Sequence, residues 1–181
     1  PYVYTKEGDK YLDFFAGIAV NCLGHAHPQL VSVLQQQASE IWHLSNAFRV
    51  PKGEELAKTL AKLSGLDKVF FTNSGTESVE CGLKMMHRYH YDRGNSERYR
   101  IIGTSSAFHG RSFAAICAAG NPTHIKGFSR EDEGFDHVPF NDLAAIEAAI
   151  TDKTAGIIVE PIQGEGGVKV ADPSYLKGLR A

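Results

Sequence analysis

The residues best suited to chemistry form a short polar run between an apolar stretch and an amphipathic helix. Ser74, Gly75 and Thr76 follow apolar residues 69–71, and apolar side chains then recur at helical spacing. Backbone N–H groups at the start of such a helix carry partial positive charge, which favours a phosphate by roughly 0.3–2 kcal/mol per interaction. The glycine permits close approach of a ligand, and the two hydroxyls add donors. The run therefore predicts an anion cradle, although an ordinary capped turn would have the same sequence.

Two further clusters of polar residues lie downstream. Residues 107–111 read AFHGR, and residues 159–167 read VEPIQGEGG. Taken singly, the Phe of the first cluster favours core packing, its Arg a solvated surface role, and the two Glu of the second are typical of loop carboxylates. Neither cluster has the spacing of a Gly-x-Gly-x-x-Gly fingerprint or a Gly-Lys-Ser phosphate loop. A dinucleotide or nucleoside triphosphate is therefore disfavoured as the source of the phosphate.

Several motifs in this order resemble the first half of the class III, fold type I, pyridoxal-phosphate-dependent aminotransferases. Further similar segments are 11–14 (YLDF), 17–21 (GIAVN), 23–28 (LGHAHP) and 175–180 (YLKGLR). Among members of the family, the acetylornithine aminotransferases are the most similar. The resemblance runs along the whole chain and implies pyridoxal 5'-phosphate as cofactor.

The resemblance also implies roles for individual residues. Gly75 and Thr76 match the pair that binds the coenzyme phosphate, with Ser74 as a neighbour. Phe108 matches the aromatic residue on one face of the pyridine ring, where stacking contributes about 0.5–1.5 kcal/mol beyond area burial. Arg111 matches the arginine that holds a substrate carboxylate, because its planar fork makes two parallel charge-assisted bonds.

The carboxylates of the third cluster receive different roles from the resemblance. Glu165 matches an acid that can pair with a downstream arginine and so gate how different substrates share one pocket. Glu160 would lie near the end of a buried strand and is expected to be structural. His109 could orient a neighbour or touch the coenzyme, and the sequence does not rank these alternatives.

The implied reaction is amino transfer between N2-acetylornithine and 2-oxoglutarate, a step of arginine biosynthesis. In that case the terminal amine reacts, and Arg111 holds the carboxylate at the far end of the donor. Ile18 and His109 replace a Tyr and a Trp of the ornithine aminotransferases, so unacylated ornithine is disfavoured. Succinylornithine or 4-aminobutyrate as donor, and a non-catalytic coenzyme-binding or interaction remnant, remain open alternatives.

The family's Schiff-base lysine lies downstream of the matched region, so no catalytic residue is expected in this chain. The candidate lysines that lack the required motif context are Lys84, Lys126, Lys153, Lys169 and Lys177. We therefore expect the 181 residues to be a fragment that is inactive alone. The family builds its sites at a dimer interface, which implies a homodimer as the complete enzyme.

Composition excludes several other classes of function. Nineteen basic and 21 acidic residues give a net charge of −2, which offers no overall attraction to nucleic acid or to an anionic membrane. No apolar run approaches the roughly 20 residues that span a bilayer, and the first residues show no signal pattern. Three scattered cysteines suit reduced thiols, so a cytoplasmic location is expected. His pairs without matching ligands predict no metal site.

The pattern of apolar residues predicts an α/β fold with a mainly parallel sheet flanked by helices. Residues 1–50 are expected to form an N-terminal segment, and 51–181 the first, incomplete half of the coenzyme-binding large domain. Polar residues 120–136 are expected to form a surface loop. The predicted strands are 2–5, 11–14, 69–72, 100–104 and 155–159. One predicted helix begins at Pro28, and a second begins at Pro51 and ends at Gly65. Three further helices are predicted at 75–91, 112–119 and 142–150.

Overall fold

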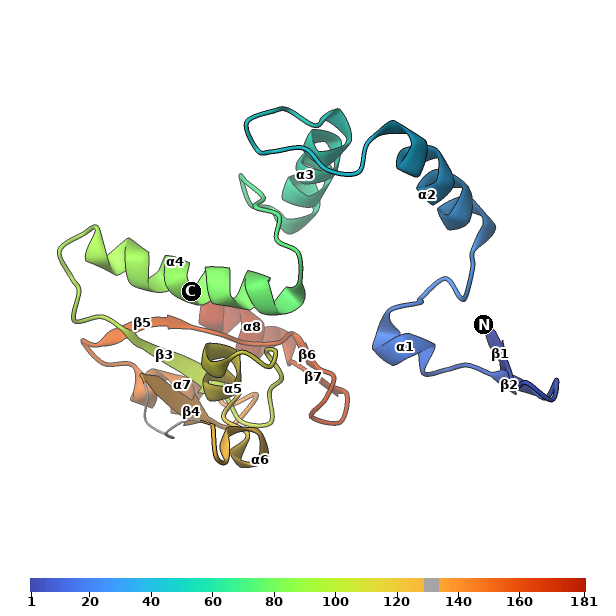
Figure 1. Ribbon diagram of the computed structural model, residues 1–181. Coiled ribbons are helices and arrows are strands. Elements are labelled where there is room, and N and C mark those ends of the chain that lie inside the picture. Colours follow the sequence, from blue (N-terminus) through green and yellow to red (C-terminus); the bar gives the residue numbers. More distant parts are fainter. Residues whose placement is uncertain (129–133) are drawn as a thin grey trace. The chain divides into compact units, whose positions relative to one another are not determined.

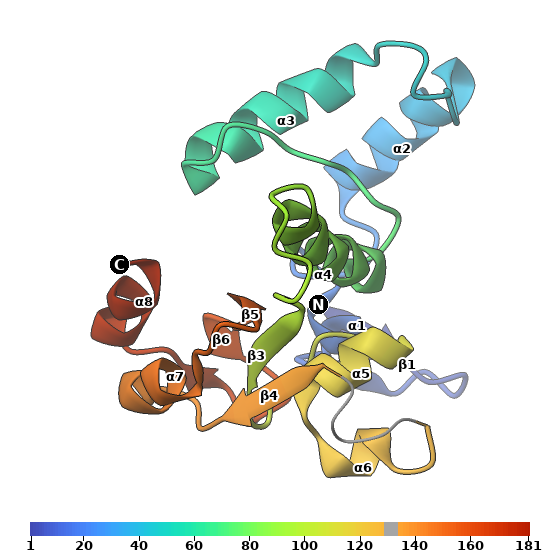
Figure 2. The same ribbon diagram turned by 90° about the vertical axis from the view of Figure 1, so that its left-hand side faces the viewer.

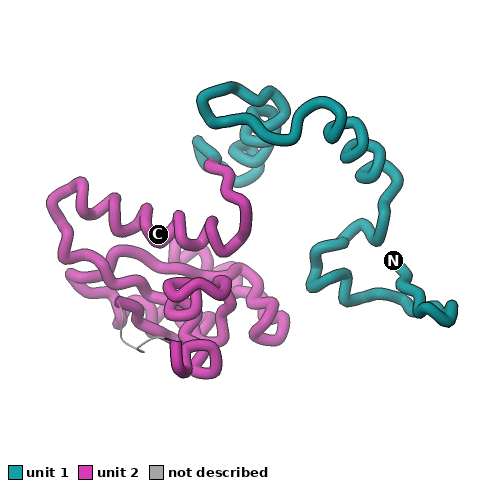
Figure 3. Tube along the Cα trace, in the orientation of Figure 1, with its two compact units in different colours: residues 1–69 teal, residues 70–181 magenta. Residues whose placement is uncertain are grey.

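The computed structural model describes residues 1–128 and 134–181, which form two compact units (Figure 3). The first unit spans residues 1–69 and the second residues 70–181. The helix that follows Pro51 therefore belongs to the first unit, whereas the sequence places a domain boundary just before it. Compactness does not test which residues build a coenzyme-binding domain, so that assignment stays a prediction.

The N-terminal unit consists of a small hairpin and helices. Strands β1 (Tyr2–Tyr4) and β2 (Lys10–Leu12) pair antiparallel, and α1 (Ala16–Ala19) is one irregular turn. Helices α2 (Pro28–Glu40) and α3 (Pro51–Ser64) both begin at proline, whose fixed φ suits the first helical position. Gly65 ends α3 at φ +69°, as predicted.

Within residues 1–69 no side chain is buried. Leu30 and Leu34 lie four positions apart on α2, and 56% and 70% of their surfaces are exposed. The helix itself is confirmed, but the N-terminal unit supplies no partner for its apolar face.

The C-terminal unit is built on a parallel sheet of three strands (Figure 1). Strand β3 (Arg100–Thr104) lies in the middle, between β4 (Phe135–Val138) and β5 (Thr154–Ile157). Two short strands, β6 (Ile162–Gln163) and β7 (Lys169–Val170), form a separate antiparallel hairpin. The predicted parallel α/β arrangement is confirmed.

Helices cover both faces of this sheet, as Figure 2 shows. On one face lie α4 (Gly75–Tyr91), which contacts β5, and α5 (Phe113–Ala119), which contacts β3. On the other face, Ile102 of β3 packs in a core with Ile146 of α7 (Leu143–Ala149) and Tyr175 of α8 (Pro173–Arg180). Because side chains alternate along a strand, neighbouring isoleucines of β3 fill opposite layers.

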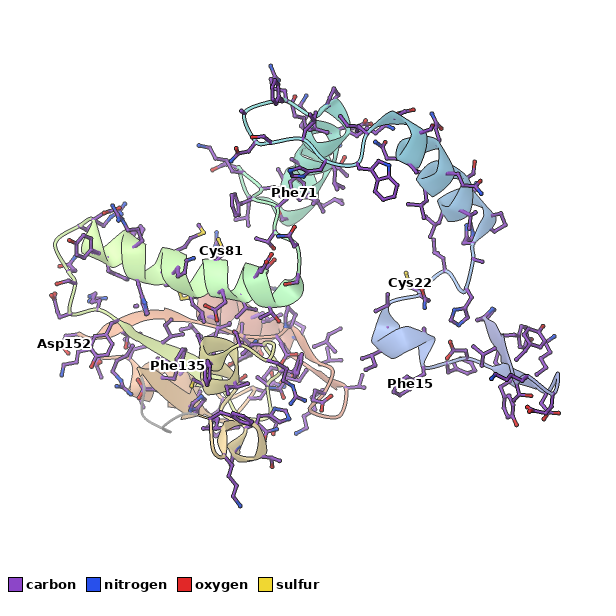
Figure 4. All side chains as sticks on the ribbon, viewed as in Figure 1. Phe15, Cys22, Phe71, Cys81, Phe135 and Asp152 are labelled. Atoms are coloured by element: carbon purple, nitrogen blue, oxygen red, sulfur yellow. The ribbon has the colours of Figure 1, made fainter. Side chains whose placement is uncertain are left out.

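Two predictions about the C-terminal unit are wrong. Residues 69–72 form no strand, and 77% of Phe70 and 50% of Phe71 are exposed on an irregular segment (Figure 4). A strand needs a hydrogen-bonded neighbour, and none of the described strands pairs with this segment. The expected loop at 120–136 contains α6 (Pro122–Ile125) and the start of β4; its residues 129–133 lie outside the described part of the chain.

Candidate functional site

Helix α4 begins as the polar run predicts. Ser74 is the N-cap, and its hydroxyl accepts a hydrogen bond from the N–H of Glu77 at 3.2 Å. The carboxylate of Glu77 reaches back and accepts the N–H of Asn73 at 2.6 Å, which completes a reciprocal cap. The next backbone N–H, that of Ser78, donates to the Ser74 carbonyl. The N–H groups of the first two helical residues therefore have no partner inside the helix.

The space in front of this helix start is partly open. A side chain added at Gly75 would meet no atom within 4 Å. Thr76, by contrast, packs closely against Gly110 of the second cluster, where an added Cβ would lie 2.7 Å from the threonine hydroxyl. The first two sequence clusters, 34 positions apart, thus meet at one point.

The second cluster follows the carboxyl end of β3. Phe108 keeps 37% of its surface exposed, and the guanidinium carbon of Arg111 lies 5.7 Å from the centroid of its ring. Arg111 is itself exposed, so its charged end is open to a carboxylate. Ser112 then caps α5 and also donates to the carboxylate of Glu80 on α4 at 2.5 Å, which ties the two helices together.

His109 points away from the exposed side of this loop. Only 7% of it is exposed, and its Nε2 is buried without a hydrogen-bond partner among the described residues. Burial, with a smaller contribution from nearby His137, lowers the pKa of His109. The neutral imidazole is thus favoured near pH 7.

The third cluster contacts the second through Glu160. Its Oε2 atom accepts the backbone N–H of Phe108 at 2.9 Å. Burial raises the pKa of Glu160, while the N–H groups of Phe108 and Gly164 act in the opposite direction. The expectation that Glu160 is structural agrees with this backbone contact.

Gln163 attaches the same cluster to the end of β3, a contact that the sequence did not reveal. Its side chain is fully buried, and its Nε2 donates to the Thr104 hydroxyl at 3.2 Å and to the Ser105 carbonyl at 3.0 Å. Glu165 lies two residues on, exposed in the loop of the β6–β7 hairpin. Within residues 1–128 and 134–181 it makes no ion pair or hydrogen bond.

Three loops thus converge beside the carboxyl ends of β3 and β5, where open α/β sheets commonly bind ligands. The arrangement offers free helix amides, an exposed aromatic ring, a guanidinium and a carboxylate. Such a set can hold a ligand that has an anionic end, a flat ring and a carboxylate. No group of three His, Cys, Asp or Glu able to hold a metal ion, and no helix able to span a membrane, occurs in the described ranges.

Comparison with known proteins gives consistent matches. The family model for class III aminotransferases matches residues 1–181. Over 99% of the chain the sequence is 51% identical to an acetylornithine aminotransferase of Agrobacterium fabrum, and over 97% it is 53% identical to acetylornithine aminotransferase 2 of Caulobacter vibrioides. The chain spans 45% and 44% of these two relatives, which is about half their length.

Solved structures of two enzymes share the fold. An ornithine aminotransferase from Toxoplasma gondii, with partial occupancy of PLP at its active site, superposes with a TM-score of 0.89 at 30% identity. An omega transaminase from Pseudomonas jessenii in complex with PMP gives 0.88 at 26% identity. Each match covers 99% of this chain and 43% or 45% of the solved chain.

Proposed function

Because the chain belongs to the class III aminotransferases, we propose that it forms part of the site of a pyridoxal-phosphate-dependent enzyme that transfers an amino group from N2-acetylornithine to 2-oxoglutarate. One observation carries the proposal: the helix start at Ser74, the Phe108–Arg111 loop and the Glu160–Gly167 segment meet beside the same strand ends. The names of relatives about 50% identical support acetylornithine as donor.

The residues present fit pyridoxal phosphate. The open space at Gly75 and the two helix amides without intrahelical partners suit a phosphate, with the Ser74 and Thr76 hydroxyls nearby. The exposed face of Phe108 suits the pyridine ring. When bound, the coenzyme draws electrons from the carbon that carries the amino group, so that the adjacent proton can leave.

The charged residues of the chain would orient the substrates. Arg111 is proposed to hold the substrate carboxylate by two parallel hydrogen bonds, which fixes the carbon that loses its proton. Glu165 is proposed to repel or admit a second carboxylate according to whether an arginine pairs with it. This accounts for one pocket that takes both an acylated diamine and a dicarboxylate.

The lysine that binds the coenzyme covalently is proposed not to be among residues 1–181, so this chain alone would not catalyse the reaction. The complete enzyme is proposed to be a cytoplasmic homodimer of arginine biosynthesis. Residues 51–181 would contribute the first half of its coenzyme-binding domain, with residues 1–50 as an N-terminal segment.

The reaction is tested with the complete protein by comparing N2-acetylornithine, succinylornithine, ornithine and 4-aminobutyrate as donors to 2-oxoglutarate. The highest kcat/KM is expected for acetylornithine. A higher kcat/KM for succinylornithine or 4-aminobutyrate would mean that this compound, and not acetylornithine, is the amino donor. No transfer from any of the four compounds would favour a non-catalytic coenzyme-binding module.

The coenzyme is tested separately on the 181-residue chain. Absorbance spectra with pyridoxal phosphate, before and after borohydride, and mass analysis should show reversible binding without a specific lysine adduct. A single reproducibly modified lysine would refute the proposal that the covalent site lies outside these residues.

A further inference from the structure

The side chain of Glu160 joins two loops that follow different strands. It lies three residues beyond the end of β5, and its Oε2 accepts the N–H of Phe108 from the loop after β3 at 2.9 Å. The N–H of Gly164, four positions further along its own segment, also interacts with the carboxylate. The carboxylate of Glu160 therefore ties its own segment after β5 to the loop after β3.

Both partners of Glu160 are donors, which makes an ionised carboxylate the suitable group. It offers two charged acceptor oxygens and no hydrogen, whereas a glutamine amide offers one neutral acceptor oxygen and an NH2 donor. Such charge-assisted bonds are shorter and stronger than neutral ones. Burial is the largest influence on Glu160 and raises its pKa, while the two N–H groups, which favour the ionised form, oppose that shift.

The loop around Gly164 is held on the end of β3 at two other points. Gln163 donates to Thr104 and to the Ser105 carbonyl, and a Cβ on Gly166 would lie 2.7 Å from the Ser106 carbonyl oxygen. These contacts fix the base of the hairpin. The Phe108 N–H is one of the points at which the opposite loop is held, and Glu160 accepts it.

We propose that Glu160 is a positioning residue that holds the loop of Phe108 and Arg111 against the loop of Glu165. The side chains of Arg111 and Glu165 are then kept at a fixed spacing for substrate carboxylates. The inference rests on the proposed function. Arg111 lies three residues beyond the anchored N–H and over the Phe108 ring, and Glu165 directly follows Gly164. Loss of the anchor therefore weakens substrate binding more than it affects the chemical step.

The test uses the complete protein with bound coenzyme and three single variants, Glu160→Gln, Arg111→Lys and, as matched control, Glu147→Gln on the exposed side of α7. Glu160→Gln is expected to raise KM for both substrates about tenfold with kcat within twofold. Hydrogen exchange at the N–H groups of Phe108 and Gly164 should become faster. Glu147→Gln should change neither.

The double variant Glu160→Gln, Arg111→Lys separates positioning from general destabilisation. If Glu160 acts through Arg111, its substitution changes KM less than twofold once the bidentate arginine is gone, so the effects are not additive. Additive effects on KM, or unchanged exchange at the two N–H groups in Glu160→Gln, would overturn the proposal for Glu160. Absence of transfer by the wild-type enzyme would instead overturn the proposed function. In that case hydrogen exchange at the N–H groups of Phe108 and Gly164 would still show whether Glu160 anchors the loop.

Discussion

Gly110 and Thr76 are packed so closely that no side chain fits between them. A Cβ on Gly110 would lie 2.7 Å from the Thr76 hydroxyl oxygen and 3.3 Å from the Cβ atoms of Thr76 and Ala115. The backbone of Gly110 also has φ +122°, which an L-residue rarely adopts. The contact places the predicted phosphate cradle directly beside the loop that carries Phe108.

Substitution of Gly110→Ala is expected to weaken both the fold and coenzyme binding. The methyl group must displace Thr76 from the helix start, and crowding of this kind costs roughly 1–3 kcal/mol of unfolding free energy. Urea unfolding and the Kd for pyridoxal phosphate measure the two effects. The matched control is Gly94→Ala, because Gly94 has φ +75° with no atom within 4 Å of an added Cβ, so it reports backbone strain without crowding.

Thr76→Ala in the Gly110→Ala background tests the same contact from the other side. Removal of the hydroxyl relieves the 2.7 Å approach, so the double variant is expected to recover part of the lost stability. If the double variant is as unstable as the sum of the single ones, crowding against the hydroxyl is not the cause.

Ser74→Ala is expected to destabilise the first turn of α4. The hydroxyl that accepts the Glu77 N–H is lost, at about 1 kcal/mol of unfolding free energy, and the Kd for the coenzyme phosphate should rise. Asp142→Ala is the control, because Asp142 caps α7 through the Ala145 N–H at 2.8 Å, outside the three converging loops. Both variants should lose similar stability, and equal weakening of coenzyme binding would contradict a phosphate site at Ser74.

Arg111→Lys should raise KM for carboxylate substrates about tenfold while the fold is unchanged. A lysine cannot make the two parallel bonds of a guanidinium, and loss of one charge-assisted bond corresponds to roughly 1.4 kcal/mol. Steady-state kinetics with both substrates measure the change. Arg93→Lys serves as control, since Arg93 lies 3.6 Å over the Tyr89 ring beyond the end of α4. An unchanged KM for both substrates in Arg111→Lys would contradict the proposal that Arg111 binds the substrate carboxylate.

The sequence predicted those parts of the structure that depend on local chemistry. Helix α4 follows from a cap at Ser74 and apolar residues at helical spacing, and its predicted span, 75–91, agrees with the structure. A cap and helical spacing are fixed by neighbours in the chain. The roles of Gly75, Thr76, Phe108 and Arg111 came instead from the resemblance to a family and stay predictions.

Features that depend on distant partners were missed. The bonds of Gln163 join residues 58 and 59 positions apart, so no local pattern reveals them. The first two residues of β4, Phe135 and Asp136, were placed at the end of a predicted polar loop, yet Asp136 pairs with Arg100 of the neighbouring strand. Residues 69–72 have strand propensity but pair with no described strand, and propensity alone does not make a strand.

The Arg100–Asp136 pair gives the C-terminal unit a defined pH dependence. The Nε and Nη2 atoms of Arg100 on β3 donate to the carboxylate of Asp136 on β4 at 2.8 and 2.7 Å. The hydrogen bond from Arg100 is the main cause of the lowered pKa of Asp136. A carboxyl whose folded pKa is depressed stabilises the fold above its unfolded pKa, near 3.8, and loses that contribution as the pH falls through the folded value.

Asp136→Asn is therefore expected to lower the free energy of unfolding by about 1 kcal/mol at pH 7, the upper end for a partly exposed ion pair. The difference from wild type should shrink as the pH drops below the unfolded pKa, since the wild-type carboxyl then becomes neutral as well. Urea titrations between pH 7 and pH 2 measure it, with Asp152→Asn as the exposed control (Figure 4). A difference that stays constant over this range would assign the loss to packing rather than to the charge of Asp136.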